Sequence, residues 1–279
     1  MRTNCAPVFT LFLFAACGTR QDATSPPAFD HATSQRVLVT SASCGDVVAS
    51  DLRLENDVTC TGDGLTVSGT GIRIDLNGHT IAGSGTGVGI RVNASQDVTI
   101  SGGTIRGFLQ GIFLAASTGV VIKDNELTAN ATGVLLQASS GNIIKANVAR
   151  QNSARAFMLR ANTAGVVSTQ NDIVDNLLID NPTGIFLISQ PGNMVKGNTI
   201  SGATVAAIDM SFAPGASGNV IKENLLISGF AGIKLAVGWT DNEFIGNTLQ
   251  ANTCGLLGPA ASNTFKDNVF VGNTTNICP

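Results

Sequence analysis

The sequence predicts an all-β protein in which a single chain winds into a parallel β-solenoid, with short strands stacked coil on coil. Three observations predict this fold class. A short pattern recurs along most of the chain, no segment shows a sustained helical period of 3.6 residues, and turn-forming residues separate the apolar segments. The 279 residues include 32 glycines and 24 asparagines. Both residue types tolerate the left-handed backbone conformations that tight corners need.

The composition limits the classes of function. Only 13% of the residues are charged, the formal net charge is −3, and the pI is about 5.3. Proteins that bind nucleic acid carry a basic surface, so we expect no nucleic-acid partner. A hydrophobic content of 43% argues against a disordered chain.

Residues 1–16 have the features of a lipoprotein signal peptide. Arg2 supplies a basic start, an apolar run extends from Val8 to Ala16, and Cys17 follows. The run is too short to cross a bilayer but suits the core of an export signal. The end of the run resembles a bacterial lipobox, which implies lipidation at Cys17, whereas cleavage without lipidation is the alternative. We expect an exported protein of the bacterial cell envelope that meets the membrane only through this anchor.

Residues 17–36 are small and polar and include two adjacent prolines, which predicts a flexible tether. His31 lies in this segment, and we interpret it as a solvated linker residue. The repeat begins after the tether, so residues 37–279 are predicted to form one β-helix domain.

The repeat consists of an apolar residue, two variable residues, asparagine, one variable residue and a second apolar residue. Nine units follow one another at intervals of 21 to 29 residues. Adjacent coils of a parallel solenoid lie about 4.8 Å apart, so equivalent asparagines should stack as a ladder of hydrogen-bonded amides. We interpret His79 as the turn residue at the head of this ladder. A single histidine at this position does not supply a multi-histidine metal site. The positions after His79 are Gly103, Asn125, Asn147, Asn176, Asn198, Asn224, Asn247 and Asn268.

A second strand follows in most units and begins with a small residue, as in the segment Gly111-Ile112-Phe113-Leu114. If Ile112 and Leu114 point inward, Phe113 points outward. Four successive coils then present large apolar residues, which is typical of an interface. We favour packing or homo-oligomerisation through this apolar stripe over a sugar-stacking floor with polar partners at its end. The outward row is Arg91, Phe113, Leu135, Met158, Phe186, Asp209 and Lys234.

The first part of the domain resembles a known superfamily. The residues that carry the resemblance are Cys44-Gly45, Asp57-Val58-Thr59-Cys60 and Asp75-Leu76-Asn77-Gly78-His79-Thr80-Ile81, followed by the repeat. Residues 37–279 thereby resemble the right-handed parallel β-helix proteins of the pectate-lyase-like superfamily, and are similar to bacterial periplasmic β-helix repeat proteins. The resemblance implies a single-stranded right-handed parallel β-helix of about 9–11 coils. It says little about activity, because this architecture hosts lyases, hydrolases, epimerases and inert binders.

Enzymes of this superfamily need a clustered catalytic set: a Ca²⁺-binding acidic cluster with a basic residue, paired acids, or an Asp/His set. None of these motifs is intact, so the sequence leaves open whether the protein is an enzyme. Ca²⁺ binding has no support, and we expect no cofactor and no metal. Arg155 and Arg160, with Arg150 and Asp172 in the longest coil, form the one basic cluster. It is a candidate contact for an anion or uronate, and a solvated loop is the alternative.

Four cysteines remain after Cys17. Cys44 and Cys60 are 16 residues apart, and Cys254 and Cys278 are 24 apart, about one coil. In an exported protein we expect both pairs to form disulfides, because the spacings suit a thiolate metal site poorly.

We therefore expect an exported, lipid-anchored β-helix that binds or processes an extracellular or cell-surface polysaccharide. Candidate ligand contacts are Arg91, Phe113, Phe186, Asp209, Lys234, Arg155 and Arg160. The alternative is a non-catalytic structural or interaction rod on the cell envelope. A metal-delivery role is disfavoured by the few histidines and methionines.

Overall fold

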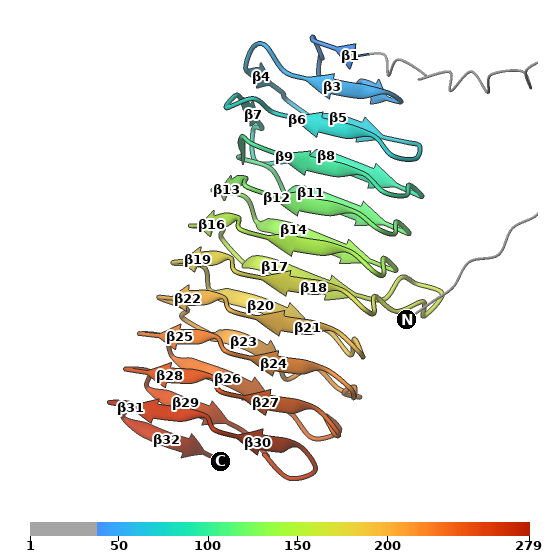
Figure 1. Ribbon diagram of the computed structural model, residues 1–279. Helices are drawn as coiled ribbons and strands as arrows, with labels where there is room; N and C mark the ends of the chain where they lie inside the picture. The colour runs from blue at the N-terminus through green and yellow to red at the C-terminus, as the bar shows by residue number, and fades with distance from the viewer. Residues whose placement is uncertain (1–37) are drawn as a thin grey trace, which may run out of the picture. The chain divides into compact units, whose positions relative to one another are not determined.

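The structure, a computed structural model, describes residues 38–279, and all strand pairs in it are parallel. The predicted signal peptide, the tether with Cys17 and His31, and residue 37 lie outside the described residues. The described chain forms 32 short strands and no helix, so it contains no helix that could cross a membrane. The strands follow one another around a continuous coil, and the coils stack along a single axis (Figure 1). This confirms the predicted fold class.

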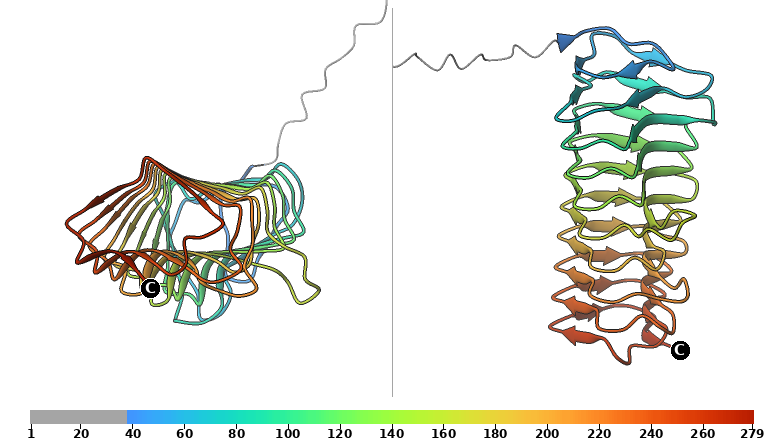
Figure 2. Two further views of the ribbon diagram at one scale, coloured as in Figure 1. Left: turned by 90° about the horizontal axis from the view of Figure 1, so that it is seen from below. Right: turned by 90° about the vertical axis from the view of Figure 1, so that its right-hand side faces the viewer.

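Each coil after the first contributes one strand to each of three sheets, which Figure 2 shows end-on and from the side. Sheet 1 has eleven strands: β1 (Leu38–Val39), β3 (Asp51–Arg53), β6 (Arg73–Asp75), β9 (Thr99–Ser101), β12 (Val121–Lys123), β15 (Ile143–Lys145), β18 (Asp172–Val174), β21 (Met194–Lys196), β24 (Val220–Lys222), β27 (Glu243–Ile245) and β30 (Thr264–Lys266). Sheet 2 has ten: β4 (Val58–Thr59), β7 (Thr80–Ala82), β10 (Thr104–Arg106), β13 (Glu126–Thr128), β16 (Val148–Arg150), β19 (Leu177–Ile179), β22 (Thr199–Ser201), β25 (Leu225–Ile227), β28 (Thr248–Gln250) and β31 (Val269–Val271).

Sheet 3 has longer strands and makes the broadest face. Its eleven strands are β2 (Val47–Val48), β5 (Leu65–Val67), β8 (Val88–Asn93), β11 (Gln110–Ala115), β14 (Thr132–Gln137), β17 (Arg155–Arg160), β20 (Thr183–Leu187), β23 (Ala206–Met210), β26 (Ala231–Leu235), β29 (Cys254–Leu257) and β32 (Thr275–Cys278). Sheets of ten and eleven strands agree with the predicted 9–11 coils.

The core is a column of inward side chains stacked from coil to coil. In the three-residue strands the central residue points inward, as Ile122 does in sheet 1 and Leu127 in sheet 2, both with 0% of their surface exposed. Near the C-terminal end the rings of Phe244 and Phe265 stack with centroids 4.6 Å apart. Period-two alternation in each strand thus places one apolar residue inside and its neighbours outside.

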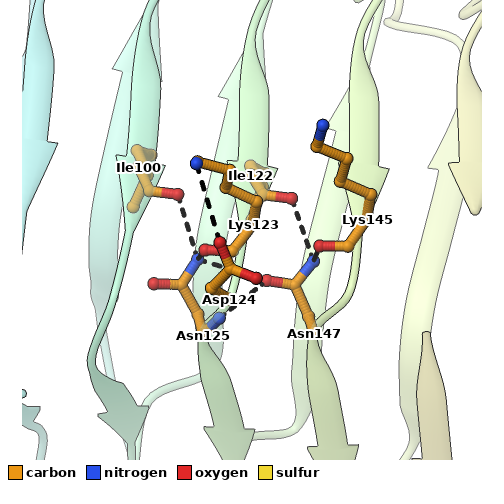
Figure 3. Close-up of polar contacts among 7 residues, drawn as sticks. All are labelled: Ile100, Ile122, Lys123, Asp124, Asn125, Lys145 and Asn147. Atoms are coloured by element: carbon orange, nitrogen blue, oxygen red, sulfur yellow. Dashed lines mark hydrogen bonds and ion pairs between the residues drawn. The ribbon is translucent and has the colours of Figure 1, made fainter. Parts of the chain in front are cut away.

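The corner between sheets 1 and 2 is held by a buried asparagine, as predicted from the repeat. Asn125 Nδ2 donates to Lys123 O at 2.8 Å and to Ile100 O of the preceding coil at 3.0 Å, while Asn147 Oδ1 accepts from the Asn125 backbone N–H at 3.1 Å (Figure 3). The residue before each asparagine has a positive φ, 55° at Asp124 for example, which turns the chain sharply. The same pattern continues through the coils to Asn268.

Two further asparagine ladders lie at the other corners, and the sequence analysis missed them. The ladder between sheets 2 and 3 is interrupted by Ala203 and Gly229, which hid its period. Its members are Asn130, Asn152, Asn181, Asn252 and Asn273. The ladder at the corner entering sheet 1 consists of Asn142, Asn171, Asn193, Asn219, Asn242 and Asn263.

Both expected disulfides are present. Cys44 bonds to Cys60 in the first coils, with an S–S distance of 2.04 Å and a Cα–Cα distance of 5.5 Å. Cys254 of β29 bonds to Cys278 of β32, with a Cα–Cα distance of 6.1 Å. The second bond attaches the last strand of sheet 3 to the strand before it.

Candidate functional site on the outer face of sheet 3

The middle outward row of sheet 3 contains the seven residues that the repeat register places there. Each is the strand partner of the next, so their side chains project from successive coils on one face. The row runs Arg91, Phe113, Leu135, Met158, Phe186, Asp209 and Lys234.

The row does not form the continuous apolar stripe that the sequence analysis expected. Leu135 is only 3% exposed and Asp209 only 6%, although both point away from the core. Phe113, Met158 and Phe186 are half-buried. The apolar surface of the row is therefore interrupted at Leu135.

Two arginines lie over the two phenylalanines of the row. The Arg91 guanidinium is 5.1 Å from the centre of the Phe113 ring, and the Arg155 guanidinium is 4.8 Å from that of Phe186. Arg91 also forms an ion pair with Asp63 at 3.6 Å. Arginine stacked on an aromatic ring is held in a fixed orientation with its N–H donors at the ring edge.

Asp209 is the buried acid of this face, and Ser211 holds it. Asp209 Oδ1 accepts from the Ser211 backbone N–H at 2.9 Å and from Ser211 Oγ at 2.6 Å. Phe186 and Lys234 are its partners on the two neighbouring strands. The arrangement places an acceptor and a cation on adjacent coils beside an aromatic ring. Sequence reasoning did not identify Ser211, although its place two residues after Asp209 is typical of a turn that folds back on a carboxylate.

The predicted basic cluster is not one site. Arg155 and Arg160 both project from β17, whereas Arg150 lies in sheet 2, where it forms an ion pair with Glu126, and Asp172 lies in sheet 1. The arginines precede the long loop and do not lie in it, because the extra residues of this coil follow the strand. Partial burial raises the pKa of the Asp172 carboxyl.

Arg160 forms the border of the face at that loop. Its Nη2 approaches Gln137 Oε1 at 3.5 Å, and its Nε is buried and has no hydrogen-bond partner among the described residues. The loop that follows, residues 161–171, projects from the rod in yellow-green in the end-on view of Figure 2. The corners of later coils carry exposed Phe212 and Val237, so loops border one side of sheet 3.

His79 precedes β7 as Gly103 precedes β10 and Asn125 precedes β13, but its side chain contacts an acid. His79 Nδ1 lies 3.2 Å from Asp57 Oδ1. The Thr80 backbone N–H and the His79 ring together hold the pKa of Asp57 below its ordinary value. The pair lies at the corner between sheets 1 and 2, apart from the row on sheet 3.

Several solved structures are similar to this chain in fold at low sequence identity. An alginate lyase from Paenibacillus sp. str. FPU-7 is 17% identical, with a TM-score of 0.61, over 86% of this chain and 99% of its own. The A-module of an Azotobacter vinelandii mannuronan C-5 epimerase is 14% identical, with a TM-score of 0.60, over 86% and 80%. A tailspike protein of E. coli bacteriophage HK620, solved with a pentasaccharide, is 11% identical, with a TM-score of 0.60, over 87% and 55%. These likenesses establish the fold.

Residues 165–278 also match the family described as periplasmic copper-binding protein. Copper sites are built from clustered imidazole and sulfur ligands. Within residues 38–279 no three His, Cys, Asp or Glu side chains lie together, His79 is the one histidine, and all four cysteines are in disulfides. Met158 points outward from sheet 3 and Met194 from sheet 1, so they do not supply a joint site. The described residues do not fit a copper centre.

Among curated proteins, none matches the chain significantly. The family model described as right handed beta helix region matches residues 39–200, which are 162 of the 279 residues. With three parallel sheets, stacked coils and asparagine corners in the structure, this chain belongs to the right-handed β-helix family.

Proposed function

We propose that this protein is exported and binds an extracellular or cell-surface polysaccharide along the outer face of sheet 3. The observation that carries the proposal is the pair of arginine-over-phenylalanine stacks on that face, at Arg91 with Phe113 and at Arg155 with Phe186. Each stack offers an aromatic surface beside planar N–H donors. Together they offer apolar contact and hydrogen bonds, the two interactions that a hydroxylated sugar ring can use.

The rest of the face supports an extended ligand. Asp209 supplies an acceptor and Lys234 a cation on adjacent coils, four and five coils from Phe113. Coils about 4.8 Å apart place these groups along roughly 20 to 24 Å, which suits several sugar units in a row. The described similarity to an alginate lyase, a mannuronan epimerase and an oligosaccharide-binding tailspike supports the same ligand class.

Binding without catalysis is the form that the face supports best. Asp209 is the one buried carboxylate of the outward row, and both of its hydrogen bonds come from Ser211. Paired-acid hydrolysis needs a second carboxyl within several ångströms of the first. Processing of the glycan is therefore the secondary hypothesis, to be decided by product analysis.

Export is supported by the two disulfides, since such bonds persist in oxidising compartments. Lipidation at Cys17 remains a proposal from the sequence, and mass spectrometry of the mature N-terminus tests it. The alternative function, a non-catalytic rod for assembly on the cell envelope, uses the same stiff solenoid but needs no glycan.

A glycan array, followed by assays for new reducing ends and unsaturated products, tests the proposal. The test variant is Phe113→Ala with Phe186→Ala, and the control is Val121→Ala with Val220→Ala on the outer face of sheet 1. We expect glycan binding that the test variant weakens and the control retains, without product. Product formation would make the protein an enzyme, and absence of binding to any glycan would favour the structural rod.

A further inference from the structure

One acid on the outer face of sheet 3 is buried although it points away from the core. It is Asp209, the one buried aspartate or glutamate among residues 38–279. A carboxylate withdrawn from water loses solvation free energy unless hydrogen bonds or a nearby cation replace the water. The contacts of Asp209 therefore show how much of this loss the protein itself compensates.

Only one oxygen of this carboxylate is hydrogen-bonded within the described chain. Oδ1 accepts from the Ser211 backbone N–H at 2.9 Å and from Ser211 Oγ at 2.6 Å. Oδ2 accepts no hydrogen bond from the described residues. It is not enclosed, because the enclosed side-chain atoms that lack a partner there belong to Asn125 and Arg160. Asp209 thus holds one oxygen against Ser211 and leaves the other open to solvent.

The neighbours of Asp209 in the row do not use this second oxygen. Phe186 lies one coil before Asp209, and Lys234 lies one coil after it. Adjacent coils are about 4.8 Å apart, yet within the described part of the chain Asp209 and Lys234 form no ion pair. Both neighbours are more exposed than Asp209. The acceptor is therefore recessed between an aromatic ring and a cation.

A recessed acceptor beside an aromatic ring limits the groups that can reach it. The ring of Phe186 offers a flat apolar surface, and Arg155 holds it from the other side at 4.8 Å. A hydroxyl at the edge of a sugar is small and donates readily to a carboxylate, in a hydrogen bond stronger than one between neutral groups. A sugar unit that rests on Phe186 can therefore direct a hydroxyl toward Asp209 Oδ2.

We propose that Asp209 is the specificity-determining residue of this face and selects an uncharged sugar unit with a free hydroxyl beside Phe186. The inference rests on the proposed glycan binding and adds the class of sugar at this position. A sugar carboxylate in the same place would meet Asp209 as a like charge, and an acylated hydroxyl would leave Oδ2 without a donor. Sites built to hydrogen-bond a ligand hydroxyl discriminate strongly against ligands that lack it.

Ser211 is the positioning residue for this carboxylate. Its backbone N–H and its hydroxyl both donate to the same oxygen, which fixes the rotation of the group and keeps Oδ2 directed away from the turn. The Oγ–Oδ1 distance of 2.6 Å is typical of a hydroxyl bonded to an ionised carboxylate. Loss of the hydroxyl leaves only the backbone donor, so the carboxylate can rotate and Oδ2 is held less firmly.

Neutral and acidic forms of the same linear hexasaccharide test the proposal. The probes are three pairs: hexamers of glucose and glucuronate, of mannose and mannuronate, and of galactose and galacturonate. Titration calorimetry gives the affinity of each for the wild type and for Asp209→Asn, which keeps the size of the side chain and an oxygen for Ser211. The matched control is Asp241→Asn, which changes the net charge equally at an exposed corner after β26.

We expect Asp209→Asn to weaken binding of a neutral hexamer about tenfold or more, since a hydrogen bond to a charged group becomes one between neutral groups. The ratio of neutral to acidic affinity should fall by at least a similar factor, because the variant no longer repels a carboxylate. Asp241→Asn should leave this ratio within about twofold, since a distant exposed charge is screened. Ser211→Ala should lower the neutral affinity by a smaller factor, and Ser211→Thr should restore it.

Two results would overturn the role of Asp209 and leave the glycan-binding face in place. One is an unchanged affinity ratio in Asp209→Asn, and the other is an equal change of the ratio in Asp241→Asn. A wild type that binds other array glycans but none of the six hexamers would likewise contradict only this inference. A wild type that binds no glycan at all would refute the proposed function, and this inference with it.

Discussion

The asparagine corners and the outer face of sheet 3 are built on the same coils with the same spacing, yet they use it in opposite ways. At the corner between sheets 1 and 2, the same residue type recurs in coil after coil from Asn125 to Asn268. On the outer face the corresponding row changes from arginine through apolar residues to aspartate and lysine.

The difference follows from what stacks favourably on its own copy. An amide donates and accepts hydrogen bonds, so a column of asparagines satisfies itself inside the protein. A charge placed about 4.8 Å from its copy is repelled, so a column of like charges does not satisfy itself as a column of amides does. Repeated positions therefore hold the fold, and the positions that vary are where specific binding can develop.

The largest effect should come from breaking a ladder. Asn198 donates through Nδ2 to Ile173 O and accepts through Oδ1 from Asn176, and all three residues are buried, with at most 2% of their surface exposed. Asn198→Ala leaves several buried groups unpaired, at about 1–3 kcal/mol for each. We expect a loss of about 3 kcal/mol or more in urea-induced unfolding, with glycan binding at sheet 3 retained in the folded protein. A loss below about 1 kcal/mol would contradict the role given to the ladder.

A smaller effect is expected at the residue before the ladder. Gly197 has φ +66°, and a Cβ there would lie 2.2 Å from Asp175 Oδ1 of the preceding coil. Gly197→Ala should cost roughly 1–2 kcal/mol in the same unfolding measurement, from the left-handed backbone and the displaced carboxylate. Asp175→Ala should remove the steric part, so the double variant should recover some of the stability. Equal losses with and without Asp175 would show that the contact does not matter.

On the outer face the effect should appear in binding and not in stability. Phe186 is half-buried beneath Arg155. Phe186→Ala should therefore lower the melting temperature only slightly. It should weaken glycan affinity about tenfold or more, which corresponds to about 1.4 kcal/mol of binding free energy. Titration calorimetry with the best array ligand measures the affinity. If the affinity were unchanged and the stability strongly reduced, Phe186 would act in the fold as the corner asparagines do, and the distinction between the corners and the outer face of sheet 3 would be wrong.

The smallest effect concerns Asp57 beside His79. Because the folded-state pKa of Asp57 is lowered, its contribution to stability is present above the unfolded pKa of about 3.9 and is lost as pH falls through the folded value. Asp57→Asn removes this contribution. The wild type should be slightly more stable than the variant at neutral pH, and the gap should close in acid. A gap independent of pH would mean that the charge of Asp57 does not contribute.

The fold was accessible from the sequence because its information is periodic and local. Apolar residues such as Ile122 and Leu127, flanking Asn125 at fixed spacing, determine both strand directions and the corner between them. The ladder broken by Ala203 and Gly229 was missed because a period detected through one residue type fails where that type is replaced.

The candidate site was less accessible. The register placed Phe113, Phe186 and Asp209 in one row, but the stacking of Arg155 on Phe186 depends on where a long side chain reaches across coils. Ser211 contacts Asp209 through a turn that the repeat does not encode. The predicted arginine cluster was wrong. Arg150 and Arg155 are close in sequence, but the coil turns between them and places them in different sheets.

By itself, the sequence determined the solenoid, its coil number, the first asparagine ladder and the Cys254–Cys278 pair, since each depends on a spacing of about one coil, and it also indicated the Cys44–Cys60 pair at a separation of 16 residues. Only the tertiary structure decided which outward residues are covered, as Leu135 is, and which remain open, as Leu177 is. The physical reason is that periodicity sets where each side chain starts, whereas burial and contact depend on all the neighbours that coiling brings around it.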